Sequence, residues 1–362
     1  VLTPSQEGQA HRRTHGDVQV QAIASLPLPF AAQARVTPLP RGAVRRALAQ
    51  FRPQIVHVQD HYPLCHSSAE VAAERHLPLV GTNHFLPANI IDEVGPFQLA
   101  PGLVRTLLWK WVLATFRRAD VVTTPTETAA AILRRTGLEA PIRAISNGVD
   151  VQRFRPDPGV DRRRMRQRYG LDPDRILLLY VGRLAEEKCL DVLLQALEQI
   201  QRNDVQVAIA GRGPYRPELE AEARELLPPQ RAILTGFVPD EDLPALLDSA
   251  DVFVMPSEAE LQSIATLEAM ASGLPVVASD AEALPELVEP GKNGYLFHSG
   301  DVQDAARALL KMLDRRSDWP AMGQASRAMA EAHDVQKTVD RYEALYLSLL
   351  GEQEAGPPGR SG

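Results

Sequence analysis

Short apolar segments rich in β-branched residues alternate with longer helical patterns along most of the 362-residue chain. In the first part, strands are expected at residues 18–25, 55–59, 79–84, 121–126 and 142–147. Helices are expected at residues 41–51, 67–76, 101–118 and 127–137. Parallel strands require a crossover connection, which is usually a helix. The alternation therefore predicts an α/β fold with parallel sheets, whose ligands bind beyond the carboxyl ends of the strands.

A segment rich in proline and charge, NGVDVQRFRPDPGVDRRR, interrupts this pattern before it restarts. The later strands are continuous apolar runs, as expected for a sheet that helices cover on both faces. They are expected at residues 175–182, 205–211, 232–238, 252–257, 275–280 and 294–297. We predict two doubly wound domains, residues 1–150 and 151–335, then a closing helix at 336–349 and a disordered tail at 350–362.

The composition restricts the classes of function. Because an ordinary domain has roughly 100 to 200 residues, a chain of 362 suggests two domains. The formal net charge of -7 argues against a general nucleic-acid-binding protein. No uninterrupted apolar run approaches the roughly 20 residues of a membrane span. Cys65 and Cys189 provide neither a disulfide framework nor a metal cluster, which favours a cytoplasmic location.

Two strand-end loops of the second series carry residues suited to a diphosphate. VGRLAEEK contributes the cations Arg183 and Lys188, which suit the charge on a departing phosphate. AGRGP contributes Gly211 and Gly213, which we interpret as a tight turn that lets a ligand approach the backbone. The alternative is that Arg183 is an ordinary surface residue and that Lys188 pairs with one of the two glutamates just before it.

The stretch SEAELQSIATLEAMASGLPVV contains two glutamates, Glu260 and Glu268, around the start of an expected helix. If Ser263 caps this helix, the amides of Ile264 and Ala265 lack intrahelical acceptors and can bind an anion. Carboxylates do not usefully bind phosphate, but they accept hydrogen bonds from the vicinal hydroxyls of a sugar. The stretch thus predicts a site in which backbone amides bind a phosphate and the two carboxylates bind sugar hydroxyls. The alternative is that both glutamates are solvated surface residues.

Four later segments, GRLAEEK, GFVPDEDLPALLDSADVFVMPSEAE, LEAMASGLPVVASD and PELVEPGKNGYLF, resemble the nucleotide-sugar domain of the retaining glycosyltransferases of family 4. ISNGVDVQRFRP resembles the interdomain junction of the same family, and the resemblance extends over about residues 50–349. It implies the GT-B fold, in which two Rossmann-like domains face a central cleft.

The resemblance also implies roles for individual residues. Glu260 and Glu268 match the E-x7-E motif, whose first glutamate contacts the transferred sugar and whose second binds the nucleotide ribose. Arg183 and Lys188 match the basic pair that binds the diphosphate. The first-turn amides of the helix match amides that also bind the phosphates.

By the same resemblance, the first domain is expected to hold the acceptor. His84, in GTNHF, matches a histidine that is common in the family and lies close to the donor sugar. His57 and His61, in HVQDHYP, are also expected at or beyond a strand end, and Asp60 is a candidate for acceptor binding. Without the resemblance, a lone histidine is more often structural than catalytic.

Two basic segments suggest proximity to a membrane. Residues 40–53, PRGAVRRALAQFRP, are cationic and amphipathic, and residues 107–118, LLWKWVLATFRR, combine tryptophans with cations. The second composition equally suits a crossover helix packed on a sheet. Because several members of the family glycosylate lipids, a membrane lipid is a candidate acceptor, and peripheral attachment to the inner membrane face is a candidate location.

We therefore predict a retaining hexosyltransferase that moves a sugar from a nucleoside diphosphate sugar to a hydroxyl acceptor. No carboxylate is convincingly placed as a covalent nucleophile, which favours same-face attack through an oxocarbenium-like state. Neither a metal nor another cofactor is expected, since the fixed cations replace a metal. A nucleotide-sugar epimerase of the same architecture is the alternative enzyme, although the E-x7-E motif and the NGVD junction favour transfer.

The chain opens with VLTPSQEG, without an initiating methionine. Its first residues resemble the end of a strand, whereas members of the family begin with that strand and a glycine-rich loop. We expect either an N-terminally truncated enzyme or a non-catalytic remnant that binds the nucleotide sugar through its second domain.

Overall fold

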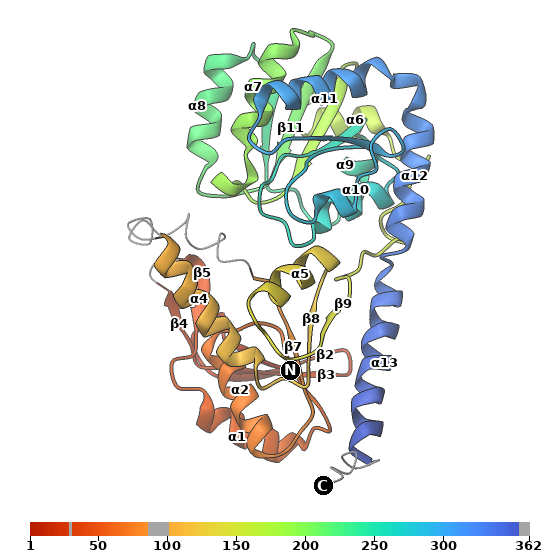
Figure 1. Ribbon diagram of the computed structural model, residues 1–362. Helices are drawn as coiled ribbons and strands as arrows, with labels where there is room; N and C mark the ends of the chain where they lie inside the picture. Colours follow the sequence, from red (N-terminus) through yellow and green to blue (C-terminus); the bar gives the residue numbers. More distant parts are fainter. Residues whose placement is uncertain (29–30, 86–100, 355–362) are drawn as a thin grey trace. The chain divides into compact units, whose positions relative to one another are not determined.

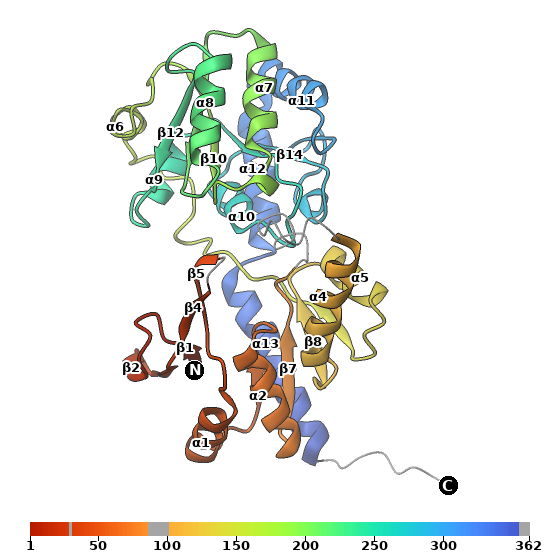
Figure 2. The same cartoon turned by 90° about the vertical axis from the view of Figure 1, so that its left-hand side faces the viewer.

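The computed structural model describes residues 1–28, 31–85 and 101–354 and divides the chain into two compact units (Figures 1 and 2). The first unit consists of Val1–Ile145 together with Arg341–Gly362, and the second consists of Ser146–Asp340. The last part of the chain therefore returns to the first unit. Each unit contains a parallel sheet with helices, so the predicted α/β class is confirmed.

The first unit is built on a four-stranded parallel sheet with the strand order β6-β7-β8-β9. Its strands are β6 (Val56–Val58), β7 (Leu79–Thr82), β8 (Val121–Thr124) and β9 (Ile142–Ala144). Its helices are α1 (Arg41–Phe51), α2 (Pro63–Glu74), α4 (Pro101–Phe116) and α5 (Glu127–Arg135). All four strands of this sheet were expected from the β-branched runs, and Thr126 caps α5 by accepting a hydrogen bond from the amide of Ala129 at 3.1 Å.

Two further small sheets precede this core. β1 (Leu2–Pro4) pairs in parallel with β3 (Val18–Ile23), and β2 (His11–His15) pairs antiparallel with β3. β4 (Leu26–Leu28) and β5 (Ala31–Val36) form an antiparallel pair. Of these five strands, only β3 was predicted in full. The sequence of β2, HRRTH, has no apolar alternation, so its strand character comes from pairing with β3.

The second unit contains a six-stranded parallel sheet with the order β12-β11-β10-β13-β14-β15. Its strands are β10 (Ile176–Val181), β11 (Val205–Ala210), β12 (Ala232–Gly236), β13 (Val252–Met255), β14 (Val276–Ser279) and β15 (Gly294–Phe297). Every residue of β11 is buried, including Gln206, whose side-chain amide exchanges two hydrogen bonds with the backbone of Asp172. All six strands lie where the apolar runs predicted them.

Helices lie on both faces of this sheet. They are α6 (Arg162–Arg168), α7 (Leu190–Ile200), α8 (Arg216–Leu226), α9 (Leu243–Asp248), α10 (Ile264–Ala271), α11 (Val302–Asp314) and α12 (Trp319–Glu331). Helix α7 packs between α8 and α11, whereas α6 packs against α9 and α10 against α12 (Figure 2). Because helices cover both faces, the six strands contain no charged residue, and the charged residues of the connecting segments lie before or after the strands.

The last helix, α13, extends over Val335–Glu354 and joins the first unit from Arg341 onward. It begins one residue before the expected span and continues five residues beyond it, so residues 350–354 of the expected tail are helical. The rest of that tail, residues 355–362, lies outside the described residues.

Two tyrosines of α13 hydrogen-bond to the sheet of the first unit. The Tyr346 hydroxyl lies 2.6 Å from Nδ1 of His57, and Nε2 of His57 lies 2.6 Å from Oγ1 of Thr82. The Tyr342 hydroxyl lies 3.1 Å from Oγ1 of Thr123. Since His57 is the central residue of β6 and both of its ring nitrogens have these partners, the prediction that it lies at or beyond a strand end is wrong. Burial lowers its pKa to about 4, as expected for a neutral structural histidine.

We expect Tyr346→Phe to destabilise the protein by about 1 to 3 kcal/mol, because it leaves a largely buried imidazole nitrogen without this hydroxyl. Urea unfolding followed by circular dichroism measures the change. Tyr215→Phe is the matched control, since the Tyr215 hydroxyl makes no hydrogen bond to any described residue. Equal unfolding midpoints for the two variants would contradict a structural role of the His57 network.

Candidate functional site

The loops that follow β10, β11 and β13 are joined to one another by hydrogen bonds in the second unit. The amide of Leu184, after β10, donates to the carbonyl of Arg212, after β11, at 2.9 Å. The amide of Glu258, after β13, donates to the carbonyl of Glu187 at 3.0 Å. Because these bonds involve main-chain atoms, the three loops form one frame at the carboxyl edge of the sheet.

Gly211 and Gly213 are required by this frame. A Cβ atom on Gly211 would lie 1.8 Å from the carbonyl oxygen of Gly182, and one on Gly213 would lie 1.9 Å from that of Leu184. Gly211 also has a φ of +152°. We interpreted these glycines as allowing a ligand to approach the backbone. In the structure, the atoms that exclude a side chain belong to the neighbouring loop, so loop packing alone accounts for both glycines.

Lys188 and Glu260 form an ion pair between two of these loops. Nζ of Lys188 lies 2.8 Å from Oε1 of Glu260 and 3.4 Å from Oγ of Ser257. Both charged side chains are largely buried, with exposed fractions of 15% and 13%. The alternative that Lys188 pairs with a glutamate just before it is wrong, because its ion-pair partner comes from the loop after β13.

Arg183 lies on the same edge and is half-exposed. Its guanidinium forms an ion pair with the carboxylate of Glu187 at 2.5 Å, and that carboxylate is buried, with an exposed fraction of 4%. Arg183 is therefore a surface residue, as the alternative held, but its position is fixed by a buried partner.

Helix α10 begins where the sequence predicted. Oγ of Ser263 accepts a hydrogen bond from the amide of Thr266 at 3.3 Å, which confirms Ser263 as the N-cap. Ile264 and Ala265, in the first turn, are partly exposed, whereas Thr266 is buried. First-turn amides have no intrahelical acceptor, so this turn can bind an anion.

Glu268 lies one turn further along α10 and is partly buried. Burial raises its pKa to about 7, while the nearby Arg153 lowers it and Asp240 raises it further. Arg153 itself forms an ion pair with Asp240 at 2.8 Å. A carboxyl group that titrates near neutrality and lies close to an anion-binding turn is suited to hydrogen bonding with hydroxyl groups.

His84 follows β7 in the first unit, and its side chain is exposed. Its Nε2 lies 3.2 Å from Oε1 of Gln59, which follows β6. Surrounding protein atoms lower the pKa of His84, and Asp60 opposes this effect. His84 therefore lies at the carboxyl edge of its own sheet, as predicted, and is mainly neutral near pH 7.

His61 and Asp60 have different environments. The ring of His61 is buried among those of Tyr62, Phe85 and Trp111, at centroid distances of 4.5 to 4.9 Å, and burial lowers its pKa to about 4. Asp60 accepts a hydrogen bond from the amide of Tyr62 at 2.7 Å, which fixes the turn into α2. His61 lies beyond the end of β6, as predicted, and Asp60 also follows this strand.

Sequence reasoning overlooked two residues that support these candidates. Ser257 donates to the carbonyl of Glu187 at 3.1 Å and thus connects the Lys188 loop to the loop of Glu260. Gln262, between the two glutamates, accepts hydrogen bonds from Ser146 and from the amide of Asn147 in the junction segment. The position of Ser257, two residues beyond the end of the apolar strand β13, was a signal that could have identified it.

Comparison with known proteins agrees with this description. Residues 161–329 match the family model "Glycosyl transferases group 1", and residues 1–153 match "Glycosyltransferase Family 4". The protein of Anabaena called HepE, solved in complex with UDP-glucose, has a TM-score of 0.76 and 21% identity, over 92% of this chain and 86% of that one. At this identity, the likeness concerns the fold alone.

Two curated relatives have higher identity. A sulfoquinovosyl transferase of Arabidopsis thaliana is 31% identical over 79% of this chain and 55% of its own length. A GDP-mannose-dependent alpha-(1-6)-phosphatidylinositol monomannoside mannosyltransferase of Mycolicibacterium smegmatis is 37% identical over 59% of this chain and 58% of its own length. The chain thus spans little more than half the length of these relatives.

The two family models and the parallel sheets of both units support the GT-B fold. One match falls on each half of the chain, so both halves of that architecture are represented. The fold predicted from the sequence is confirmed. Among the described helices, none combines the length and the apolar character needed to cross a lipid bilayer.

The raised pKa of Glu268 should make stability depend on pH. A carboxyl group whose pKa is higher in the folded state stabilises the protein below its unfolded-state pKa of 4.5, and this contribution disappears as the pH rises through about 7. We therefore expect the stability of Glu268→Gln, relative to the unsubstituted protein, to increase between pH 5 and pH 8. Urea unfolding at both pH values measures this change, with Glu343→Gln, at an exposed glutamate of α13, as the control. A constant difference between Glu268→Gln and the unsubstituted protein would argue against a raised pKa.

Proposed function

We propose that this chain is a retaining glycosyltransferase that moves a hexose from a nucleoside diphosphate sugar to a hydroxyl acceptor. The observation that carries the proposal is the shared frame at the carboxyl edge of the second sheet. Arg183, Lys188 and Glu260 come from loops that are hydrogen-bonded to one another, and the loop of Glu260 leads into α10, which carries the anion-binding first turn and Glu268. This combination suits a ligand that has both phosphate and sugar groups.

In the proposed donor complex, each group has a separate role. Arg183 and Lys188 donate charge-assisted hydrogen bonds to the diphosphate, and the amides of Ile264 and Ala265 also donate to its oxygens. Glu268 accepts hydrogen bonds from the ribose hydroxyls. Glu260, held by Lys188, orients the hydroxyls of the transferred sugar.

The proposed reaction needs no covalent sugar–enzyme intermediate. The bond between the anomeric carbon and the diphosphate oxygen breaks, and the acceptor oxygen bonds to the same face of that carbon. The proton of the acceptor hydroxyl passes to the departing phosphate. Arg183, Lys188 and the amides of α10 stabilise the negative charge that develops on the leaving diphosphate, which is the main electrostatic contribution that we assign to the protein.

We propose that the reaction uses neither a metal ion nor another cofactor, since the guanidinium and ammonium groups supply charge-assisted hydrogen bonds to the leaving group. His84 is the proposed acceptor-side residue near the transferred sugar. Its lowered pKa supports this role, because a neutral imidazole can both donate to and accept from hydroxyl groups.

We further propose a membrane lipid as acceptor and peripheral binding at the cytoplasmic membrane face. The name of the mycobacterial relative includes phosphatidylinositol monomannoside, which is a lipid. On this chain, Leu39 precedes α1 and Phe51 is its last residue, with exposed fractions of 92% and 71%, beside the exposed Arg46 and Arg52. Exposed apolar side chains among cations suit an anionic lipid surface. Arg41 and Arg45 contribute less, because both form ion pairs with Glu74.

The donor site is tested by substitution. Lys188→Met and Glu268→Ala should each weaken donor binding at least about tenfold, because each removes a charged contact to the donor. Calorimetry with a panel of nucleoside diphosphates and their sugars measures the affinity, and transfer of a radiolabelled sugar measures turnover. Glu260→Ala should reduce turnover more than donor affinity, because it acts on the sugar.

Lys292→Ala is the control for these variants, because Lys292 is an exposed lysine of the same unit whose ion pair with Glu289 lies on the surface. Circular dichroism identifies variants that fail to fold, since Glu260 loses its buried partner in Lys188→Met. If folded Lys188→Met and Glu268→Ala bind the donor like the control, the site assignment is wrong. If the protein converts the donor sugar in the absence of an acceptor, it is the epimerase. If it binds the donor but transfers the sugar to none of the acceptors tested, it is the non-catalytic remnant.

A further inference from the structure

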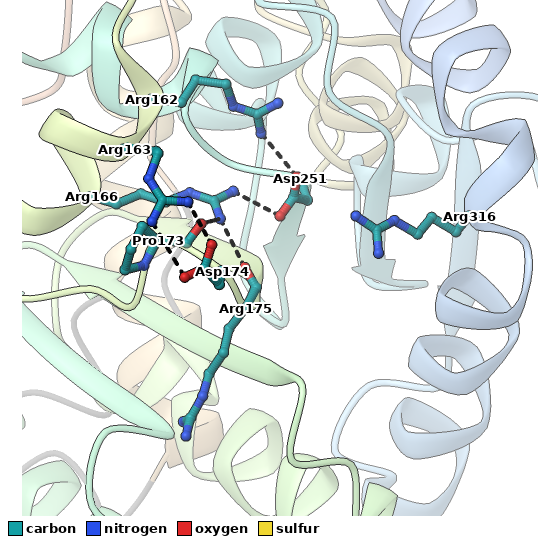
Figure 3. Close-up of a pocket in the computed structure, with 8 residues that line it drawn as sticks. All are labelled: Arg162, Arg163, Arg166, Pro173, Asp174, Arg175, Asp251 and Arg316. Carbon is teal, nitrogen blue, oxygen red and sulfur yellow. Dashed lines mark hydrogen bonds and ion pairs between the residues drawn. The ribbon is translucent and has the colours of Figure 1, made fainter.

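A second cationic site lies in the second unit, at the edge of the sheet where the strands begin. It is a pocket of about 280 Å³. Its lining residues, all drawn in Figure 3, are Arg162, Arg163, Arg166, Pro173, Asp174, Arg175, Asp251 and Arg316. They come from α6, from the segments before β10 and β13, and from the short helix Arg316–Asp318.

Two of the arginines form the fixed floor of this pocket. Arg166 is buried and donates to the carbonyls of Ser249 and Arg175 at 2.9 and 2.8 Å, and to Asp251 at 2.8 Å. Arg162 donates to the carbonyl of Ala250 at 2.7 Å and to the other oxygen of Asp251 at 2.9 Å. Asp251 also accepts from the amide of Leu177, so its carboxylate is fully engaged.

The rim of the pocket is less constrained. Arg163 pairs with Asp174 at 2.5 Å, but both side chains are exposed, with fractions of 63% and 73%. Figure 3 shows Arg316 on the other side of the opening, with its guanidinium toward Asp251. Arg316 stacks on the ring of Trp319 at 5.7 Å and forms no hydrogen bond or ion pair with the described residues. Arg316 thus has a guanidinium without an ion-pair partner among the described residues, and Arg163, across the rim, has one in a solvent-exposed pair that a phosphate can replace.

The pocket has an excess of positive charge. Figure 3 shows the Arg175 side chain extending away from the other lining residues, so the guanidinium groups of four arginines and two carboxylates surround the pocket, with a net charge of +2. The Arg175 guanidinium pairs with Asp172, outside the lining, at 3.4 Å, so this pair does not change the excess. Concave sites with one sign of charge concentrate ions of the opposite sign, and planar guanidinium groups bind phosphate oxygens in pairs.

We propose that this pocket binds the phosphate group of a small phosphorylated molecule, between Arg316 and Arg163 and above the floor of Arg162 and Arg166. Since one water occupies roughly 30 Å³ in the liquid, a pocket of about 280 Å³ holds a phosphate together with the small group that it esterifies. The site takes a phosphomonoester, whether in a soluble metabolite or in a lipid headgroup.

This site is separate from the proposed donor site. Arg175 comes directly before β10, whereas Arg183 follows it. The six residues of β10, at roughly 3.3 Å each, separate the two edges by about 20 Å. A ligand in the pocket therefore leaves the donor-site cations free to bind their own ligand.

Titration calorimetry of the whole chain with inorganic phosphate and with glycerol 3-phosphate tests the proposal. The double variant Arg163→Ala/Arg316→Ala should bind both probes at least about tenfold more weakly than the unsubstituted protein. Arg164→Ala should bind them unchanged, because Arg164 is an exposed arginine of the same helix that does not line the pocket. Arg183→Ala/Lys188→Met should also retain binding, which distinguishes the pocket from the donor site.

Three results would overturn the proposal: no binding of either probe by the unsubstituted protein, equal binding by the Arg163→Ala/Arg316→Ala variant, or loss of binding only in the donor-site variant. Far-ultraviolet circular dichroism shows that each variant is folded. Flotation with vesicles containing phosphatidic acid distinguishes the two ligand sources. If the protein floats with the vesicles and flotation is lost in the Arg163→Ala/Arg316→Ala variant, the ligand is a lipid phosphate. If the protein binds glycerol 3-phosphate but does not float with the vesicles, the ligand is a soluble phosphomonoester.

Discussion

Burial of a parallel sheet on both faces is the constraint on which the second unit depends. Its central strands are apolar along their length, and β11 is buried at every position. Helices exclude water from both faces of the sheet. Charged side chains close to the sheet can therefore reach solvent only in the segments where strands begin or end. Because all six strands run in the same direction, residues that follow strands gather at one edge and residues that precede strands gather at the other.

Main-chain hydrogen bonds between loops determine the geometry of the carboxyl edge. Gly211 and Gly213 allow the loop after β11 to approach the loop after β10 so closely that no side chain fits between them. Ser257 and Glu258 attach the loop after β13 to the carbonyl of Glu187. Because main-chain hydrogen bonds hold these loops together, we expect donor binding to require little reorganisation of the backbone, which preserves affinity.

Features of the fold that depend on a local sequence pattern were predicted correctly. The six strands of the second sheet and the cap of α10 by Ser263 follow from apolar runs and from N-cap chemistry, which act over a few residues. The sequence predicted poorly what depends on distant partners. Strand β2 exists because β3 pairs with it, and His57 became structural because α13 brings Tyr346 to it from 289 residues away. Neither partner leaves a signal near the residue that it affects.

The Lys188–Glu260 pair shows how such a distant partner changes the chemistry of a site. Spacing alone suggested two free cations and two free carboxylates, whereas Arg183 pairs with Glu187 and Lys188 with Glu260. These four groups sum to zero charge, so net charge does not attract a diphosphate to them. An ammonium group has three donors, and Glu260 and Ser257 accept two of the three from Lys188. A phosphate oxygen can therefore accept a hydrogen bond from the third N–H of Lys188 without breaking the ion pair between Lys188 and Glu260. Affinity for a diphosphate at this edge must then come from well-oriented hydrogen-bond donors. The main-chain frame and the first turn of α10 fix the orientation of these donors.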